Sequence, residues 1–353
     1  MAAPPPVYSP GANTTAHLGA AGTRQGRVNS DPPRKEPILR CSVKRLFGNN
    51  GAVVFFFISI PFSAFSAVSA CSAFNRNGRA FAPGERHLNV RICVLGSGTS
   101  HGVPMIGCRC PVCTSPDPRN RRLRTSAAVR LGERTVLIDT TPELRLQALA
   151  AGIDRVDAVL FTHTHADHVM GFDDVRRFAE LSGRPTPVYA SPASLALLLH
   201  IFDYALTDIR FGMTGIPVVE WHAWTEPFEI AGHRVTPVPL EHGTHLATGI
   251  RFDSPQGRSA AWCPDCHGIP AASRDPLCGL DMLFIDGLRH RPHPTHFTVA
   301  QALDAIRDLA PRQAYLVHMT HDLDHETTER ALPQMDEVPG GIRLAYDGLV
   351  VDV

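Results

Sequence analysis

The most constraining feature of the chain is a run of seven residues from Thr162 to His168, with the sequence Thr-His-Thr-His-Ala-Asp-His. It follows the apolar run 156–161, whose short length and turn-prone borders are typical of a buried strand rather than a helix. The polar run would then lie at the carboxyl end of a strand, where open α/β sheets usually carry their sites. Three imidazoles and a carboxylate are costly to bury unless a cation binds them. Their nitrogen and oxygen atoms suit Zn²⁺, Mn²⁺ or Fe.

The spacing within this run indicates more than one metal ion. His163, His165, Asp167 and His168 lie so close together on a tight loop that their side chains cannot all point at a single ion. We therefore expect two neighbouring divalent metals, Zn²⁺ or Mn²⁺, to share them. The alternative is a solvated histidine-rich loop, which the preceding buried strand argues against.

A second cluster contains Cys108, Cys110 and Cys113, three of the nine cysteines of the chain. Spacings this tight suit a metal better than disulfides, and they indicate a reducing compartment, so we expect a cytoplasmic protein. Three thiolates would need a fourth ligand to complete a tetrahedral zinc site. The alternative is three free thiols in a loop.

The overall composition is that of an ordinary soluble α/β protein. The chain has 353 residues, of which 34 are Lys or Arg and 34 are Asp or Glu, and 44% are hydrophobic. This length is ample for one α/β domain with an extension. A formal net charge of zero gives no reason to expect a nucleic acid or a membrane surface as partner.

Residues 1–88 differ from the rest of the chain. Residues 1–40 are rich in Pro, Gly, Ala, Ser and Arg without apolar periodicity, which predicts disorder. The apolar stretch 51–74 has three interpretations: a signal anchor weakened by Pro61, an export signal ending near Cys71, or a translation start assigned too far upstream, with Leu88 as the true start. We favour the last and place the folded domain at residues 89–353.

The domain alternates short strands with helices. Strands are expected at 90–95, 127–131, 135–139, 188–190, 218–221, 228–230, 234–238, 248–252, 259–263, 280–285 and 313–317. Helices are expected at 142–151, 171–181, 192–204 and 299–309. The glycine-rich turn 96–99 is no nucleotide fingerprint, because cysteines follow where a helix should open. Mixed strands with interspersed helices predict an α/β fold with two sheets packed face to face and helices outside, an αββα sandwich.

Two motifs resemble a known family. The pattern His-x-His-x-Asp-His after a buried strand resembles the signature of the metallo-β-lactamase superfamily. The stretch 94–126, with its cysteines, resembles the PhnP branch, which contains a phosphoribosyl 1,2-cyclic phosphate phosphodiesterase. The resemblance covers residues 89–353 and implies an αββα sandwich and a dinuclear metal-dependent hydrolase.

The resemblance also implies further ligands at the ends of later strands. His242 would join His163 and His165 on one metal, and His318 would join Asp167 and His168 on the other. Asp265 matches the bridging carboxylate, although the flanking Cys263 and Cys266 depart from the aromatic residue or Thr usual in the family. His245 is the alternative to His242.

Two more roles follow from the same resemblance. The PhnP branch carries a structural zinc held by three cysteines and a histidine, which assigns His321 as the fourth ligand, with His325 as the alternative. Related phosphodiesterases place a proton-donating histidine before the helix at 299–309, so His296 is the expected general acid and His293 the alternative. A capping or packing role for these histidines is the competing interpretation. The arginines of the run 119–124 could clamp a phosphate, but such runs usually form a solvated face, and we expect a solvated face here.

The resulting functional expectation is a phosphodiesterase acting on a small cyclic phosphate such as phosphoribosyl 1,2-cyclic phosphate, with Asp167 and His296 as catalytic residues. The absence of a fused basic arm argues against tRNA as substrate. The alternatives are a tRNA 3′-end endonuclease, a lactone or thioester hydrolase, and a non-catalytic metal-stabilised binding protein. We expect no nucleic-acid or membrane partner. The sequence leaves open whether the protein forms a homodimer.

Overall fold

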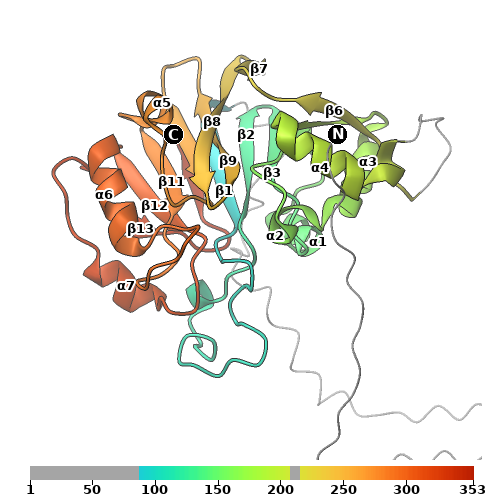
Figure 1. The fold of residues 1–353 in the computed structure, drawn as a ribbon. Coiled ribbons are helices and arrows are strands. Elements are labelled where there is room, and N and C mark those ends of the chain that lie inside the picture. Colours follow the sequence, from blue (N-terminus) through green and yellow to red (C-terminus); the bar gives the residue numbers. More distant parts are fainter. Residues whose placement is uncertain (1–86, 207–214) are drawn as a thin grey trace, which may run out of the picture. The chain divides into compact units, whose positions relative to one another are not determined.

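The computed structural model describes residues 87–206 and 215–353 (Figure 1). The predictions of disorder and of an alternative start concern residues 1–88. Of these residues, only the last two, 87 and 88, are among those described. Strand β1 (His87–Gly96) begins just before the predicted domain start at 89. Within the described ranges, no helix has the length and apolar character needed to cross a membrane.

The first sheet contains seven strands in the order β14-β1-β2-β3-β4-β5-β6. Besides β1, its strands are β2 (Ser126–Gly132), β3 (Arg134–Ile138), β4 (Ala158–Leu160), β5 (Thr186–Ala190), β6 (Val219–Ala223) and β14 (Val350–Asp352). Strands β14, β1, β2 and β3 pair antiparallel, whereas β3 to β6 pair parallel. Parallel pairs need crossover connections, and here helices supply most of them.

The second sheet also contains seven strands, in the order β13-β12-β11-β10-β9-β8-β7. They are β7 (Phe228–Ile230), β8 (His233–His242), β9 (His245–Asp253), β10 (Ser259–Cys263), β11 (Met282–Asp286), β12 (Gln313–Val317) and β13 (Ile342–Leu344). Strands β10 to β13 are parallel, so their carboxyl ends meet at one edge.

Helices cover the outer face of each sheet. The α-helices are α1 (Leu144–Ala151), α2 (Ala166–Val169), α3 (Arg176–Ser182), α4 (Pro192–Ile201), α5 (Ala271–Arg274), α6 (Val299–Leu309) and α7 (His325–Ala331). Short 3₁₀ helices are η2 (Pro118–Asn120), η3 (Phe172–Val175), η4 (Asp203–Leu206) and η5 (Asp275–Leu277). Figure 1 shows α1 to α4 in green on one side and α6 and α7 in orange-red on the other.

The core has three apolar layers. Along β1, Ile92 and Val94 face the second sheet and pack with Trp262 and Phe284, whereas Cys93 and Leu95 face the helices, as the two-residue period of a strand requires. Two further clusters lie under α1, α3 and α4 on the first sheet and under α6 on the second. The predicted αββα sandwich is confirmed.

Several elements differ from the prediction. The expected helix 171–181 begins as η3 and becomes α3, and the expected helix 192–204 ends at Ile201. Strands β13 and β14 and helix α7 were missed. The hairpin β8–β9 runs much further than expected, to the pair His242 and His245. Pro237 and Pro239 concealed this extension. β8 tolerates them because, on the side away from β9, its pairing with β7 stops at Val235 and its bridge to Gly268 begins only at Glu241.

Candidate functional site

The run 162–168 forms the loop after β4 and the first turn of α2. His165 occupies the position that begins α2, and Asp167 and His168 lie in its first turn. The change from extended to helical backbone at His165 turns successive side chains in different directions. His163 and His168 are buried, and Asp167 is partly buried.

His163 and His165 meet His242, the last residue of β8. The three residues offer nitrogen atoms that all lie within 4.8 Å of one another. His242 Nε2 lies 3.2 Å from His165 Nδ1. On the other side of its ring, His242 Nδ1 lies 2.8 Å from the Thr295 carbonyl oxygen, which can only accept a hydrogen bond. This hydrogen bond requires the proton of the neutral ring to be on Nδ1, so the lone pair of Nε2 faces the other histidines.

Asp167 and His168 meet His318, which follows β12. The three offer ligand atoms within the same 4.8 Å limit, with His168 Nε2 3.3 Å from Asp167 Oδ2. His318 has a φ of 60°, a left-handed conformation that is rare for a residue with a Cβ. Such backbone strain persists where the surroundings impose it, typically at functional sites.

The carboxylate of Asp265, just beyond β10, lies between the two groups. Its Oδ1 is 3.3 Å from His168 Nε2 and 3.2 Å from His318 Nδ1, and its Oδ2 is 3.9 Å from His163 Nε2. The position is that expected of a bridging ligand. We call the seven residues the histidine cluster; its members are His163, His165, Asp167, His168, His242, Asp265 and His318.

The buried atoms of this cluster fit a divalent cation. Among the described residues, His163 Nε2, His168 Nε2 and Asp265 Oδ1 are buried without a hydrogen-bond partner. Each such atom costs about 1–3 kcal/mol unless something satisfies it. Burial lowers the pKa of His163, and it lowers that of His318 to about 3, so both imidazoles are neutral at pH 7. Neutral imidazoles and a carboxylate are the donor set that divalent metals take.

Asp139 directly follows β3 and holds the loop 162–168 in place. It was not predicted as a site residue. Its fully buried carboxylate accepts hydrogen bonds from the Thr162 N–H and hydroxyl, both at 2.8 Å. It also accepts one from His168 Nδ1 at 2.8 Å, which leaves His168 Nε2 to face the cluster. The signal was present in the sequence, because Asp139 ends an apolar strand as Asp265 does.

His296 and Asp286 form a second unit beside the cluster. Asp286, the last residue of β11, accepts a 2.6 Å hydrogen bond from His296 Nδ1. His296 belongs to a group of potential ligands with His242 and Asp265, and its ring stacks on His318 with centroids 4.8 Å apart. Burial alone would lower the pKa of His296, but the Asp286 carboxylate raises it above the ordinary value. Asp286 was another unpredicted residue at a strand end.

The alternatives to the assigned histidines lie further from the cluster. His293 belongs to none of the ligand groups, although its ring centroid is 5.0 Å from that of His296. His245 is exposed, with its ring 6.2 Å from that of His165. A capping box closes the N-terminus of α6: the Thr298 hydroxyl accepts from the Gln301 N–H, and the Gln301 side chain accepts from the Thr298 N–H.

The cysteine cluster consists of Cys108, Cys110, Cys113 and His321. The three Sγ atoms lie 3.2, 3.5 and 3.4 Å from His321 Nδ1, in chain order. A hydrogen bond from the Cys113 N–H lowers the pKa of Cys110 to about 6, which favours its thiolate. The alternative ligand His325 instead lies in the first turn of α7, where its Nε2 is 3.1 Å from Glu329.

The prediction that the arginines of the run 119–124 form a solvated face is wrong for Arg122. Arg122 is fully buried and donates hydrogen bonds to the carbonyl oxygens of Thr320 (2.9 Å) and Leu323 (2.8 Å). It therefore joins the loop after the cysteines to the segment that carries His321. The spacing of charges along the chain could not reveal this contact across about two hundred residues.

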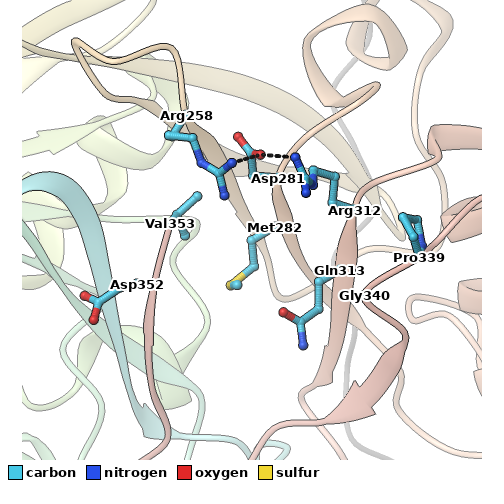
Figure 2. Close-up of a pocket in the computed structure, with 9 residues that line it drawn as sticks. All are labelled: Arg258, Asp281, Met282, Arg312, Gln313, Pro339, Gly340, Asp352 and Val353. Carbon is cyan, nitrogen blue, oxygen red and sulfur yellow. Dashed lines mark ion pairs between the residues drawn. The ribbon is translucent and has the colours of Figure 1, made fainter.

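A separate hollow of about 310 Å³ lies where β10, β11 and β12 begin, at the edge opposite their carboxyl ends (Figure 2). Asp281 there pairs with Arg258 at 3.0 Å and with Arg312 at 4.0 Å. None of the potential metal-binding groups found among the described residues lies in this hollow. The candidate site is therefore the opposite edge.

Comparison with known proteins places this architecture in a family. Residues 134–319 match the family described as "Beta-lactamase superfamily domain". A solved structure of a diphosphatase from the PhnP family is 43% identical, covers 75% of this chain and 97% of its own, and superposes with a TM-score of 0.67. Zinc-bound PqqB from Methylobacterium extorquens, at 23% identity, covers 74% of this chain and 100% of its own with a TM-score of 0.61, and shows the fold alone.

A curated relative carries a different name. The octanoyltransferase of Porphyromonas gingivalis is 36% identical over 263 residues, which are 74% of this chain but 51% of that protein. This chain thus spans about half the length of that relative, and the remaining half has no counterpart in the match.

Proposed function

Because this chain belongs to the metallo-β-lactamase superfamily, and within it resembles the PhnP family, we propose that it is a phosphodiester hydrolase dependent on two divalent metals. The observation that carries the proposal is the position of Asp265 between two groups of three ligands, each with its atoms within 4.8 Å. The 43% identity to a diphosphatase supports chemistry at phosphorus rather than at a carbonyl group.

In this proposal each half of the histidine cluster holds one metal, Zn²⁺ or Mn²⁺. His163, His165 and His242 would hold the first, Asp167, His168 and His318 the second, and Asp265 would contact both. Two bound cations would lower the pKa of a water molecule and neutralise charge on the attacked phosphate. Asp139 orients His168, and the Thr295 carbonyl orients His242, so both imidazoles present Nε2 to the site.

His296 is the proposed general acid. Its Nδ1 is bound to Asp286, so its Nε2 is the atom available to give a proton to the departing oxygen. The Asp286 carboxylate raises the pKa of His296, although burial opposes this, and thereby keeps the imidazole protonated nearer neutral pH. Contact with both His242 and Asp265 places His296 at the cluster in a way that His293 does not share.

The cysteine cluster is proposed to hold a structural zinc. Three thiols and one imidazole form a complete tetrahedral donor set with no open position. Its His321 follows the ligand His318 by three residues, so the zinc would stabilise the backbone that carries a residue of the active site.

For the substrate we propose a small phosphodiester, such as a cyclic phosphate, and no nucleic acid or membrane partner. The test is a panel of substrates with the purified, Mn²⁺- or Zn²⁺-loaded protein. We expect hydrolysis of bis-p-nitrophenyl phosphate and of a cyclic sugar phosphate. A metal-loaded protein that hydrolyses no phosphodiester but cleaves lactones or thioesters would overturn the proposal.

The relative named octanoyltransferase supplies a second candidate, hydrolysis of an acyl ester or thioester. The same metal cluster could act on a carbonyl group, since cations polarise carbonyl and phosphoryl oxygens alike. An octanoyl thioester in the panel separates the two candidates. Its cleavage at a higher kcat/KM than any phosphodiester would favour acyl chemistry.

A further inference from the structure

A hollow of about 620 Å³ opens directly beside the histidine cluster. Its walls come from both sheets, and we call it the apolar hollow. Its lining includes His163 and His165, the start of α4, Trp224 just after β6, Pro237 and Pro239 of β8, and residues 244–248 of the β8–β9 hairpin. The volume is typical of sites that bind small molecules. Because His163 and His165 form part of its wall, the hollow directly adjoins the histidine cluster.

Most of the lining surface is apolar, and its polar side chains are Ser, Thr and His. No Arg, Lys, Asp or Glu is among the described residues that line it, and its ionisable groups are His163, His165 and His245. Leu197 of α4 is 50% exposed and Leu246 of the hairpin is 66% exposed, although both are large apolar side chains. A ligand that covered them would remove this apolar surface from water, which is favourable.

The polar groups at the start of α4 are already engaged. The Ser191 hydroxyl caps the helix by accepting from the Ser194 N–H at 3.3 Å and donates to the Ser194 hydroxyl at 3.0 Å. Trp224 packs edge-on against Phe228, with ring centroids 5.6 Å apart. Thr164, Thr225, Thr244 and Thr248 also line the hollow, so it offers apolar contact and neutral hydroxyl groups but no cationic Arg or Lys side chain.

The proposed general acid lies outside this hollow. His296 is not among its lining residues, whereas His165 is, and His242 contacts both, at 3.2 Å from His165 and with its ring 4.7 Å from that of His296. The two sides of the cluster would thus receive different parts of an acyclic diester. The group that leaves with a proton from His296 would lie on one side, and the group retained on phosphorus would lie on the other.

We infer that the apolar hollow binds the retained substituent of the substrate and selects an uncharged, apolar organic group there. The inference rests on the proposed phosphodiesterase function and narrows its substrate class. A substituent bearing a second phosphate would be buried in this hollow without an arginine or lysine partner, which is unfavourable. This makes a phosphorylated sugar a poorer occupant than an aryl or alkyl group.

The test compares two diesters that release the same leaving group, methyl p-nitrophenyl phosphate and phenyl p-nitrophenyl phosphate. We expect the phenyl diester to have a kcat/KM at least tenfold higher. Leu246→Glu and Leu197→Glu should each reduce this ratio at least fivefold, because they place a charge at the rim. Both leucines are exposed, so neither change removes a core contact. The matched control is Leu149→Glu on α1, where the leucine is 64% exposed and does not line the hollow; it should leave both kcat/KM values unchanged.

A binding measurement separates failure of this inference from failure of the proposed function. Isothermal titration calorimetry should give a dissociation constant for diphenyl phosphate at least tenfold lower than for dimethyl phosphate, with the difference reduced in Leu246→Glu. If neither p-nitrophenyl diester is hydrolysed but diphenyl phosphate still binds more tightly, the proposed function is wrong and the inference that the hollow binds an apolar group is supported. If both are hydrolysed at equal kcat/KM and the leucine variants leave the ratio unchanged, the inference is overturned and the proposed function stands.

Discussion

The two clusters of potential metal ligands in this protein are built in different ways. The cysteine cluster takes three of its four side chains from six consecutive residues of a partly exposed loop, and only His321 is distant in sequence. The histidine cluster takes its members from the ends of β4, β8, β10 and β12, in both sheets, and most of them are buried.

In the proposed function, this difference separates a structural from a chemical role. A closed set of thiolates and one imidazole has no position left for a substrate, so a metal there would stabilise the loop. The histidine cluster instead keeps unsatisfied buried atoms pointing inward, a neighbouring His296–Asp286 pair and an adjacent hollow. The predictions below test this separation, from the largest expected effect on activity to the smallest.

Replacing Asp167 by Ala should abolish activity. Asp167 is the carboxylate of the second proposed metal site, and the variant should lose about half of the metal bound at the histidine cluster while the melting temperature changes little. Metal analysis, phosphodiesterase assays and thermal unfolding measure these quantities. Asp154→Ala, at an exposed aspartate in the connection between α1 and β4, is the control. Turnover and metal content equal to the unchanged protein would refute the two-metal assignment.

Replacing His296 by Ala should lower kcat by roughly 10²–10⁴-fold, the range for loss of a general acid. Metal content should remain, since His296 is not a proposed ligand. The effect should shrink for substrates with good leaving groups such as p-nitrophenol, which need less protonation. His293→Ala is the matched control and should retain nearly full activity. If the His293 variant were the impaired one, the roles of the two histidines would be reversed.

Replacing Asp139 by Asn should weaken metal binding or activity by roughly 10–100-fold, as is usual when a residue that orients a ligand is lost. The amide would keep the size of the side chain but would bring an N–H₂ group toward Thr162 and His168, which both donate to Asp139. Titration of the metal-free variant with Zn²⁺, followed by kcat/KM measurement, tests this. An unchanged affinity would mean that the loop is held by its backbone alone.

Replacing Cys110 by Ser should act mainly on stability. The variant should lose one metal ion per chain and several degrees of melting temperature, because a structural metal contributes folding free energy. Loss of the metal would release His321, and His318 lies three residues before it. Activity should fall only to the extent that His318 is displaced as a result. Cys278→Ser, at an exposed free cysteine, is the control. A Cys110 variant with unchanged melting temperature and metal content would show that the cysteines are ordinary loop thiols.

Local patterns in the sequence were sufficient for much of this protein. The run 162–168 and the three cysteines each concentrate their chemistry within about six residues, so spacing alone identified them as metal-binding candidates. Alternation of apolar residues located most strands, because a strand that is buried on one or both faces shows its burial in its own sequence. His242, Asp265 and His318 required the family resemblance, since a single polar residue after a strand is a weak signal.

What only the tertiary structure decided involves contacts between residues far apart in the chain. Asp139 meets His168 because β3 and β4 lie side by side, and Arg122 is buried only because the segment 320–323 folds over it. The long β8–β9 hairpin, hidden by two prolines, depends on the gap in strand pairing beside Pro237 and Pro239 on the other side of β8. The apolar hollow exists only where α4 and this hairpin approach the same histidines. Sequence periodicity reports whether a residue is buried, but not which distant element buries it, and for that reason the partners of the site became visible only in the fold.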